Sequence, residues 1–236
     1  MGKALIIPGA DFSANGIQPE FTRLAWIGTP IQPGVYTDSG IFFANKDVNN
    51  PYDELEFCLT IDSTKIQDDS EWSSGFRSLG SGYNTQTNCH IWFGKTFCAS
   101  YFSGTNKQSS SYSYSSLSDG SRHTFVINRY GGKIDDDSTT FAFDSPVDLS
   151  EYDPAAMTSG RIYLDARSLV NQGSNYLHAT AEDAVKIHWV KYRRNGVLIL
   201  DAIPVRRNSD EKIGFYDLVN DEYHFRNDNS VPVYGL

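Results

Sequence analysis

Three consecutive aspartates, Asp135, Asp136 and Asp137, form a run of potential metal ligands. A Ca²⁺ ion is held by about six to eight oxygen ligands, and carboxylates are among those it prefers. Because neighbouring side chains point in different directions, a calcium cage would also need backbone carbonyl groups or Asp119 from elsewhere in the chain. Aspartates that follow two glycines are also typical of a hairpin turn. The sequence therefore permits a calcium site and favours a turn, and it indicates no other cofactor.

Carbohydrate binding is the second chemistry that the sequence offers. It needs an exposed aromatic ring for the apolar side of a sugar and planar polar groups for its hydroxyls. Five residues that could line one face of a sheet are the candidates for stacking and hydrogen bonding: Trp72, Arg77, Tyr83, Trp92 and Tyr101. Most aromatic side chains of a β-sandwich belong to its core, which is the alternative interpretation of these residues.

Catalytic groups are harder to find. A retaining glycosidase needs two carboxylates about 5–5.5 Å apart, and the nearest approach is Glu54 with Glu56, where the residue between them is Leu55. Solvated charges on an outer strand face are the favoured interpretation. The five histidines show no i, i+2 or i, i+4 pairs among themselves, and there is no Gly-x-Ser-x-Gly motif. We therefore expect a protein that is not an enzyme, with a glycosidase as the less favoured alternative.

Composition and charge narrow the choice of partners. The chain has 236 residues and a formal net charge of −9, which repels phosphate backbones and anionic lipid surfaces, so neither nucleic acid nor membrane is an expected partner. No apolar run approaches the roughly 20 residues that span a bilayer. The apolar part of the first eight residues is too short for a signal peptide, so we expect synthesis in the cytoplasm without export.

The cysteines indicate neither a disulfide framework nor a structural zinc site. Cys58, Cys89 and Cys98 are odd in number and lack Cys-x-x-Cys spacing. Buried thiols on strands are the favoured interpretation, and a bridge between Cys89 and Cys98 is the alternative.

Alternation of apolar and polar residues, the period of a strand with one buried face, recurs along the chain. In residues 53–62 it places Leu55, Phe57, Leu59 and Ile61 on one face. The same period is found in residues 123–129, 139–143, 161–166 and 185–192. With 14% aromatic residues and many Gly, Ser, Asn and Asp, the composition is that of short strands and turns.

Turn signals indicate how these strands connect. Asn195-Gly196 between two apolar runs predicts a tight antiparallel hairpin, and Gly131-Gly132 predicts a second reversal in the middle of the chain. Residues 103–118 are rich in serine and can be either a loop or a polar edge strand. Residues 148–157 are the only place where a helix is expected. Many short strands without a linker predict one all-β domain, a two-sheet antiparallel β-sandwich of the jelly-roll kind.

Segments in a fixed order along the chain resemble motifs of the LamG-like, concanavalin A-like jelly rolls found in proteins of gut bacteria and their phages. They are Tyr36–Ile41, Gly75–Ser78 with Ile91–Phe93, Asp119–Phe125, and Asn195–Arg207 followed by Ile213–Asn220. The chain departs from the family pattern at Arg122, Leu200 and Ala202, where Trp, Arg and Phe are usual.

The resemblance implies a jelly-roll domain over residues 24–236, with residues 1–23 as an N-terminal segment that could anchor it. It also implies a non-enzymatic structural protein of a phage or prophage tail or fibre, located in the virion. The expected partners are other virion proteins, a second copy of the chain in a homo-oligomer, and host-surface carbohydrate in an adhesion role. A carbohydrate-binding module of a bacterial surface protein is the alternative.

Overall fold

The computed structural model describes residues 20–28, 42–43, 53–62, 66–67, 87–93, 96–103, 106–113, 119–128, 130–135, 139–142, 162–163, 178–179, 185–225 and 234–235. All regular structure within these residues is β-strand, and each strand pair is antiparallel. None of these residues forms a helix with the length and hydrophobicity needed to cross a bilayer. The helix expected at 148–157 lies outside the described residues.

The strands form one large sheet and three smaller ones. The bounds are β1 Phe21–Arg23, β2 Ile27–Gly28, β3 Phe42–Phe43, β4 Asp53–Ile61, β5 Ile66–Gln67, β6 Thr87–Phe93, β7 Thr96–Ser103, β8 Asn106–Ser113, β9 His123–Asn128, β10 Gly131–Ile134, β11 Thr139–Ala142, β12 Ile162–Tyr163, β13 His178–Ala179, β14 Val185–Arg194, β15 Val197–Arg207, β16 Ile213–Asp217, β17 Glu222–Phe225 and β18 Tyr234–Gly235.

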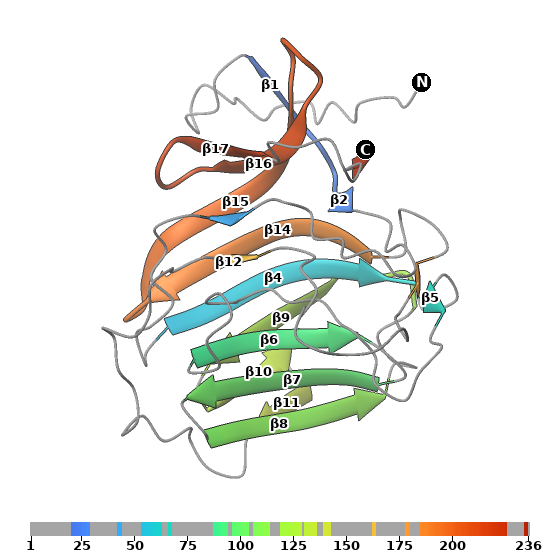
Figure 1. Cartoon of the computed structure of the whole chain (residues 1–236), viewed down its shortest axis with the longest axis vertical. Coiled ribbons are helices and arrows are strands. Elements are labelled where there is room, and N and C mark those ends of the chain that lie inside the picture. Colours follow the sequence, from blue (N-terminus) through green and yellow to red (C-terminus); the bar gives the residue numbers. More distant parts are fainter. Residues whose placement is uncertain are drawn as a thin grey trace.

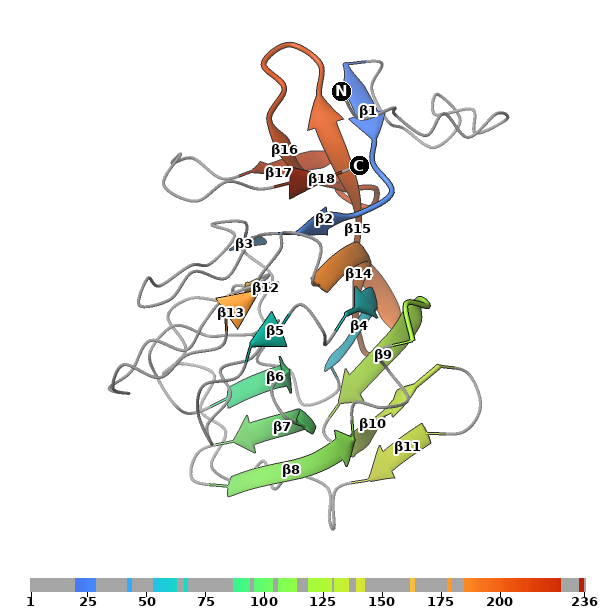
Figure 2. The ribbon, with the colours of Figure 1, turned by 90° about the vertical axis from the view of Figure 1, so that its right-hand side faces the viewer.

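The large sheet has eleven strands, eight of them in the order β11-β10-β9-β4-β14-β15-β16-β17. Of the other three, β1 pairs with β15, β2 pairs with β14, and β18 pairs with β2. Strands β6, β7 and β8 form a separate sheet, while β12 pairs with β3 and β13 with β5. The β6–β8 sheet lies in front of β9, β10 and β11 in Figure 1, and the turned view of Figure 2 separates the two layers. The predicted all-β, two-sheet antiparallel sandwich is confirmed.

Strand β4 supplies the centre of the core. Leu55, Phe57, Leu59 and Ile61 are all at most 1% exposed, as their alternation predicted. On the neighbouring strand β9, Phe125 pairs with Phe57 in register, and the two rings stack with centroids 5.8 Å apart. Burying side chains of this size stabilises the fold by about 1.5–3 kcal/mol each, so this face of β4 contributes strongly to the stability of the sheet.

The hairpin between β14 and β15 follows the prediction from Asn195-Gly196. Both residues have positive φ, 51° and 77°, and Arg194 pairs directly with Val197 across them. A two-residue turn with two positive φ values matches the right-handed twist of the flanking strands, and asparagine followed by glycine adopts it at low cost. Because β14 also pairs along β4, this turn brings β15 into the middle of the large sheet.

The reversal in the middle of the chain is present, but the two glycines do not make it. Gly131 and Gly132 lie inside β10 and pair with Asn128 and Ile127 of β9. The chain turns just before them, where the side chain of Asn128 accepts a hydrogen bond of 2.9 Å from the backbone N–H of Tyr130. An asparagine that bonds two residues ahead makes a turn without glycine, which is why the position of the turn was wrong.

The serine-rich segment contains a strand. Residues 106–113 form β8, which pairs with β7 at the edge of the three-stranded sheet, so the polar edge-strand interpretation of this segment is confirmed. In the same sheet the register pairs Cys89 with Tyr101 and Cys98 with Trp92. A bridge between adjacent strands needs the two cysteines nearly opposite each other, so this register does not allow a Cys89–Cys98 disulfide.

A second apolar cluster lies around β15, β16 and β1. Its buried members are Ile203, Val205 and Tyr216, and Phe21, Trp189, Leu218 and Tyr223 pack against them. Strand β1 pairs with β15, and the Phe21 ring lies 5.0 Å from that of Tyr223. The described end of the predicted N-terminal segment is therefore an edge strand of the large sheet, whereas residues 1–19 lie outside the described residues.

Candidate functional site

Few of the candidate ligand-binding residues lie within the described part of the chain. Trp72, Arg77 and Tyr83 lie outside the described residues, as do Asp136 and Asp137. Trp92 lies on β6 and Tyr101 on β7. Trp92 is paired with Cys98, which is three residues from Tyr101 along β7. Since successive positions of a strand alternate between faces, positions 92 and 101 belong to opposite faces of this sheet.

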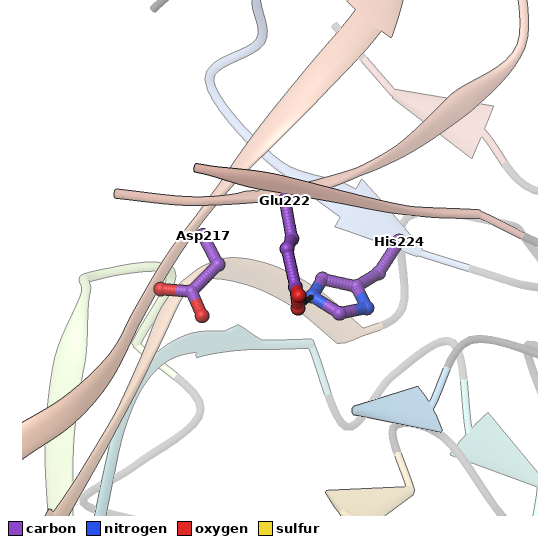
Figure 3. Close-up of side chains that lie close together, drawn as sticks. All are labelled: Asp217, Glu222 and His224. Atoms are coloured by element: carbon purple, nitrogen blue, oxygen red, sulfur yellow. Dashed lines mark ion pairs between the residues drawn. The ribbon is translucent and has the colours of Figure 1, made fainter. Parts of the chain in front are cut away.

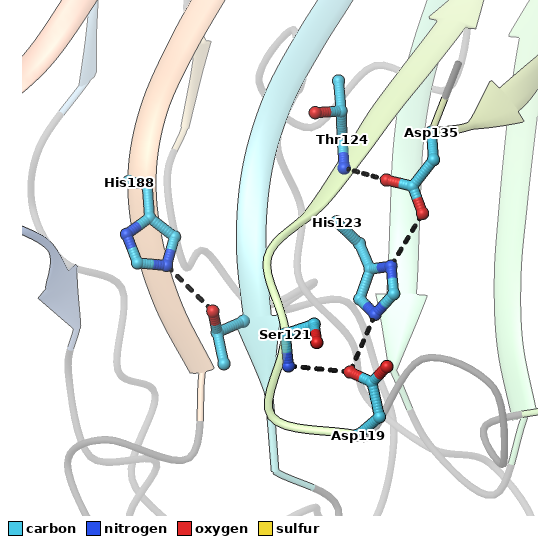
Figure 4. Close-up of polar contacts among 7 residues, drawn as sticks. Asp119, Ser121, His123, Thr124, Asp135 and His188 are labelled. Atoms are coloured by element: carbon cyan, nitrogen blue, oxygen red, sulfur yellow. Dashed lines mark hydrogen bonds and ion pairs between the residues drawn. The ribbon is translucent and has the colours of Figure 1, made fainter.

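Asp135 takes part in a histidine bridge that the sequence did not predict. His123 begins β9 and lies between two carboxylates (Figure 4). Its Nδ1 is 2.8 Å from Oδ2 of Asp135, and its Nε2 is 3.2 Å from Oδ1 of Asp119. The backbone N–H groups of Thr124 and Ser121 donate to Asp135 and Asp119 at 2.8 and 2.7 Å. A doubly protonated imidazolium satisfies this arrangement, since each ring nitrogen then donates to a carboxylate.

The backbone explains why these groups meet. Strand β10 pairs with β9 up to Ile134, and Asp135 follows with φ of 56°, which turns the chain at that point. The backbone N–H of Asp135 donates to the carbonyl oxygen of Thr124 at 2.7 Å. Asp135 therefore begins a turn, as predicted. Both of its carboxylate oxygens contact β9, and the ring of His123 lies between it and Asp119; the calcium site of residues 135–137 remains a prediction.

The electrostatics of the bridge favour the charged ring. Burial works against a charge on His123, but hydrogen bonds to Asp135 and Asp119 outweigh this effect and raise the pKa of the imidazole above 6.5. The pKa of Asp119 is lowered in turn, first by the N–H of Ser121 and then by His123. With its ring protonated, His123 forms ion pairs with Asp119 and Asp135 that join the loop before β9 to the turn after β10.

His188 is a contrasting case on strand β14. The register between β4 and β14 shifts between Ile187 and Trp189, so His188 is the extra residue of a β-bulge. Its Nδ1 donates to the carbonyl oxygen of Ala25 at 2.8 Å, and its Nε2 lies 2.9 Å from the hydroxyl of Thr60. A carbonyl only accepts, so Nδ1 carries the proton and Nε2 accepts from Thr60. Burial lowers the pKa of His188, and the ring is neutral.

We expect these two histidines to titrate on opposite sides of pH 6.5. The stability from His123 is complete below 6.5 and is lost as the pH rises through its higher folded-state pKa. The stability from His188 is present above 6.5 and is lost as the pH falls through its lower folded-state pKa. An NMR titration of the ring protons measures both values directly. His123→Gln should destabilise the protein more at pH 6 than at pH 8.5; an equal loss at both values would contradict the charged bridge.

The two glutamates of β4 face away from the core, as predicted, and are paired as well as solvated. Arg193 on β14 contacts Oε2 of Glu56, and its Nη1 lies 3.8 Å from Oε1 of Glu54. The side-chain amide of Asn128 donates to Glu54 at 3.3 Å. These contacts give both carboxylates a role in joining β9, β4 and β14.

A second cluster lies on the hairpin of β16 and β17. Asp217 ends β16, and Glu222 and His224 share one face of β17 (Figure 3). One potential ligand atom from each residue lies within 4.8 Å of the other two. Histidine pairs alone do not reveal this cluster, because its sequence signal is the Glu-x-His spacing of Glu222 and His224. That spacing places both side chains on one strand face and could have revealed half of this cluster.

The fold defines an antiparallel β-sandwich and leaves the particular protein family open. Comparison with known families finds no family model that matches the chain, and comparison with curated proteins finds no match either.

Proposed function

We propose that this protein is a non-enzymatic structural and recognition module of a phage or prophage tail or fibre, and that it binds host-surface carbohydrate. The observation that carries the proposal is that ionisable side chains of the described sheet are engaged in contacts within the fold. The ring nitrogens of His123 contact the loop before β9 and the turn after β10, and those of His188 contact Ala25 and Thr60 of β4. The carboxylates of Glu54 and Glu56 contact Arg193 of β14. These groups build a rigid scaffold, which suits binding and assembly.

The phage assignment is supported by the jelly-roll motifs of the sequence. The strands of these motifs that lie within the described residues belong to a two-layer antiparallel sandwich. Scaffolds of this kind bind ligands on a sheet face or on the loops between strands. Because such scaffolds host many unrelated functions, the proposal depends on a binding measurement.

The test is a glycan-array screen of the purified chain with and without Ca²⁺, together with its mass by light scattering. Specific binding and a discrete oligomer support the whole proposal. Binding that requires Ca²⁺ would support the calcium site at Asp135, Asp136 and Asp137. A silent array with a monomeric mass would overturn both recognition and assembly, and cleavage of a bound glycan would favour the glycosidase alternative.

Trp92→Ala and Tyr101→Ala are expected to have different effects, because the two positions belong to opposite faces of the β6–β8 sheet. The variant on the ligand-binding face should lower glycan affinity about tenfold, since loss of one stacked ring removes roughly 1 kcal/mol, and should leave the unfolding midpoint unchanged. The variant on the inner face should lower the midpoint instead. Equal loss of affinity in both variants, without loss of stability, would rule out this use of the two faces.

A further inference from the structure

We propose that Asp217, Glu222 and His224 bind a divalent transition metal ion, with Zn²⁺ as the ion that suits their donors. The proposal is independent of carbohydrate binding and of the calcium site at residues 135–137. It assigns a metal-binding role to the hairpin of β16 and β17, near the edge of the large sheet.

The hairpin geometry brings the three donors together. Glu222 and His224 are two residues apart on β17, so their side chains leave the same face. Asp217 is the direct cross-strand partner of Glu222. All three side chains extend from the same side of the hairpin in Figure 3. The turn of residues 218–221 is held against β15, because the N–H of Leu218 donates to the carbonyl oxygen of Asp201 at 2.8 Å and the amide of Asn220 donates to that of Ile199 at 3.0 Å.

The distances are close to those of a bound ion. Zn²⁺ lies about 2.0–2.2 Å from nitrogen and oxygen ligands, which places the ligand atoms of a tetrahedral site roughly 3.2–3.6 Å apart. Nε2 of His224 is 3.6 Å from Oε2 of Glu222, which is longer than a hydrogen bond. The atoms of all three residues lie within 4.8 Å of one another, so small side-chain rotations complete the approach.

Neighbouring groups hold Asp217 in a fixed orientation. This residue is fully buried, and its Oδ1 accepts hydrogen bonds from the backbone N–H groups of Asp201 at 3.1 Å and Val219 at 3.0 Å. The amide of Asn220 donates to Oδ2. A carboxylate offers about four lone-pair positions, so one carboxylate can accept hydrogen bonds and bind a metal ion at the same time. Ligating carboxylates are commonly oriented by such outer hydrogen bonds.

The donor set selects the ion. An imidazole nitrogen suits Zn²⁺ and similar transition metals, whereas Ca²⁺ and Mg²⁺ are bound by oxygen. Two carboxylates also balance the double positive charge of the ion beside a buried group. Glu222 has a side chain 58% exposed, which leaves a path for the ion and for a water molecule in the fourth position.

The bridge of His123 provides a matched control. It also contains one histidine and two carboxylates, but its two ring nitrogens each contact a carboxylate oxygen, at 2.8 and 3.2 Å. A metal there would have to displace one of these contacts. Zinc affinity should therefore depend on His224 and not on His123.

The experiment is a zinc titration of the full chain after treatment with a chelator, by calorimetry and by competition with a zinc indicator. We expect one Zn²⁺ per chain, binding at least tenfold tighter than Ca²⁺ or Mg²⁺. His224→Gln should weaken binding by tenfold or more, and His123→Gln should leave it unchanged. Absence of zinc binding by the unmodified chain, or equal binding by His224→Gln, would overturn the proposal.

A second variant covers the case in which His224→Gln does not fold, which far-ultraviolet circular dichroism would show. Glu222→Gln changes an exposed side chain and should keep the fold. It should weaken zinc binding by tenfold or more, and zinc should raise the unfolding midpoint of the unmodified chain but not of this variant. Retention of full affinity in Glu222→Gln would likewise overturn the site.

Discussion

Phe125→Ala is expected to lower the free energy of unfolding by about 3–5 kcal/mol, the range for removing a buried aromatic ring from a core. The Phe125 side chain is 0% exposed and stacks on Phe57 across the pair of β9 and β4. Neither strand can move to fill the cavity without breaking its hydrogen bonds to a further neighbour, β10 or β14. Chemical denaturation measures the loss directly.

The control for this prediction is Val197→Ala, because Val197 is 63% exposed. Its effect should stay within about 0.5 kcal/mol. Phe57→Ala alone should also be costly, and the double variant with Phe125→Ala should lose less than the sum of the two, since the rings share one contact. A loss below about 1 kcal/mol for Phe125→Ala would show that the core is centred elsewhere.

Asp217→Ala is expected to lower the free energy of unfolding by about 3 kcal/mol in metal-free protein. The carboxylate accepts hydrogen bonds from the backbone N–H groups of Asp201 and Val219 and from the amide of Asn220. Alanine removes the acceptor of the Asp201 and Val219 N–H groups at a fully buried side-chain position, at roughly 1–3 kcal/mol for each group left unsatisfied, whereas the amide of Asn220 keeps the carbonyl oxygen of Ile199 as an acceptor. Thermal and urea unfolding in the presence of a chelator measure the loss.

Two substitutions sharpen this test. Asp217→Asn keeps one carbonyl oxygen as an acceptor and should lose less than alanine does. Asp210→Ala removes an exposed carboxylate from the neighbouring turn, where it pairs with Arg207 at the surface, and should have little effect. If Asp210→Ala and Asp217→Ala were equally destabilising, the buried hydrogen bonds of Asp217 would not be what holds the hairpin.

These two predictions concern different parts of one sheet. Phe125 tests the core beneath the part of the large sheet that faces β6–β8, whereas Asp217 tests the hairpin that carries the proposed metal site. Loss of zinc binding in Asp217→Ala with the fold retained would separate the role of this residue as a ligand from its role in the turn. If Asp217→Ala does not fold, the zinc affinity of Glu222→Gln tests the metal site instead.

Patterns that depend on a few neighbouring residues were predictable. The alternation of residues 53–62 predicted which face of β4 is buried, since the period of a strand is two and one face must leave water. Asn195-Gly196 predicted the hairpin of β14 and β15, since both residues tolerate positive φ. The turn predicted at Gly131-Gly132 was placed wrongly, because glycine also occurs inside strands. The chain turns earlier, at the hydrogen bond between Asn128 and Tyr130.

Contacts between distant residues were not predictable in the same way. Thr60 and His188 are 128 residues apart, and the bulge that turns His188 towards Thr60 has no signal in the sequence. His123 meets Asp135 only because β9 and β10 pair in one particular register. A shift of that register by one residue would move every side chain to the other face.

Local patterns in the sequence were enough to predict an antiparallel β structure, the residues of β4 that form its core, and the position of the hairpin between β14 and β15. The folded structure was needed to see that the pKa is raised for His123 and lowered for His188, that Glu54 and Glu56 share Arg193, and that Asp217 lies beside Glu222 and His224. The difference follows from the separation along the chain of the residues that interact. Strand period and turn conformation depend on adjacent residues, whereas ion pairs and ligand clusters depend on strand order and register, which the whole sheet sets together.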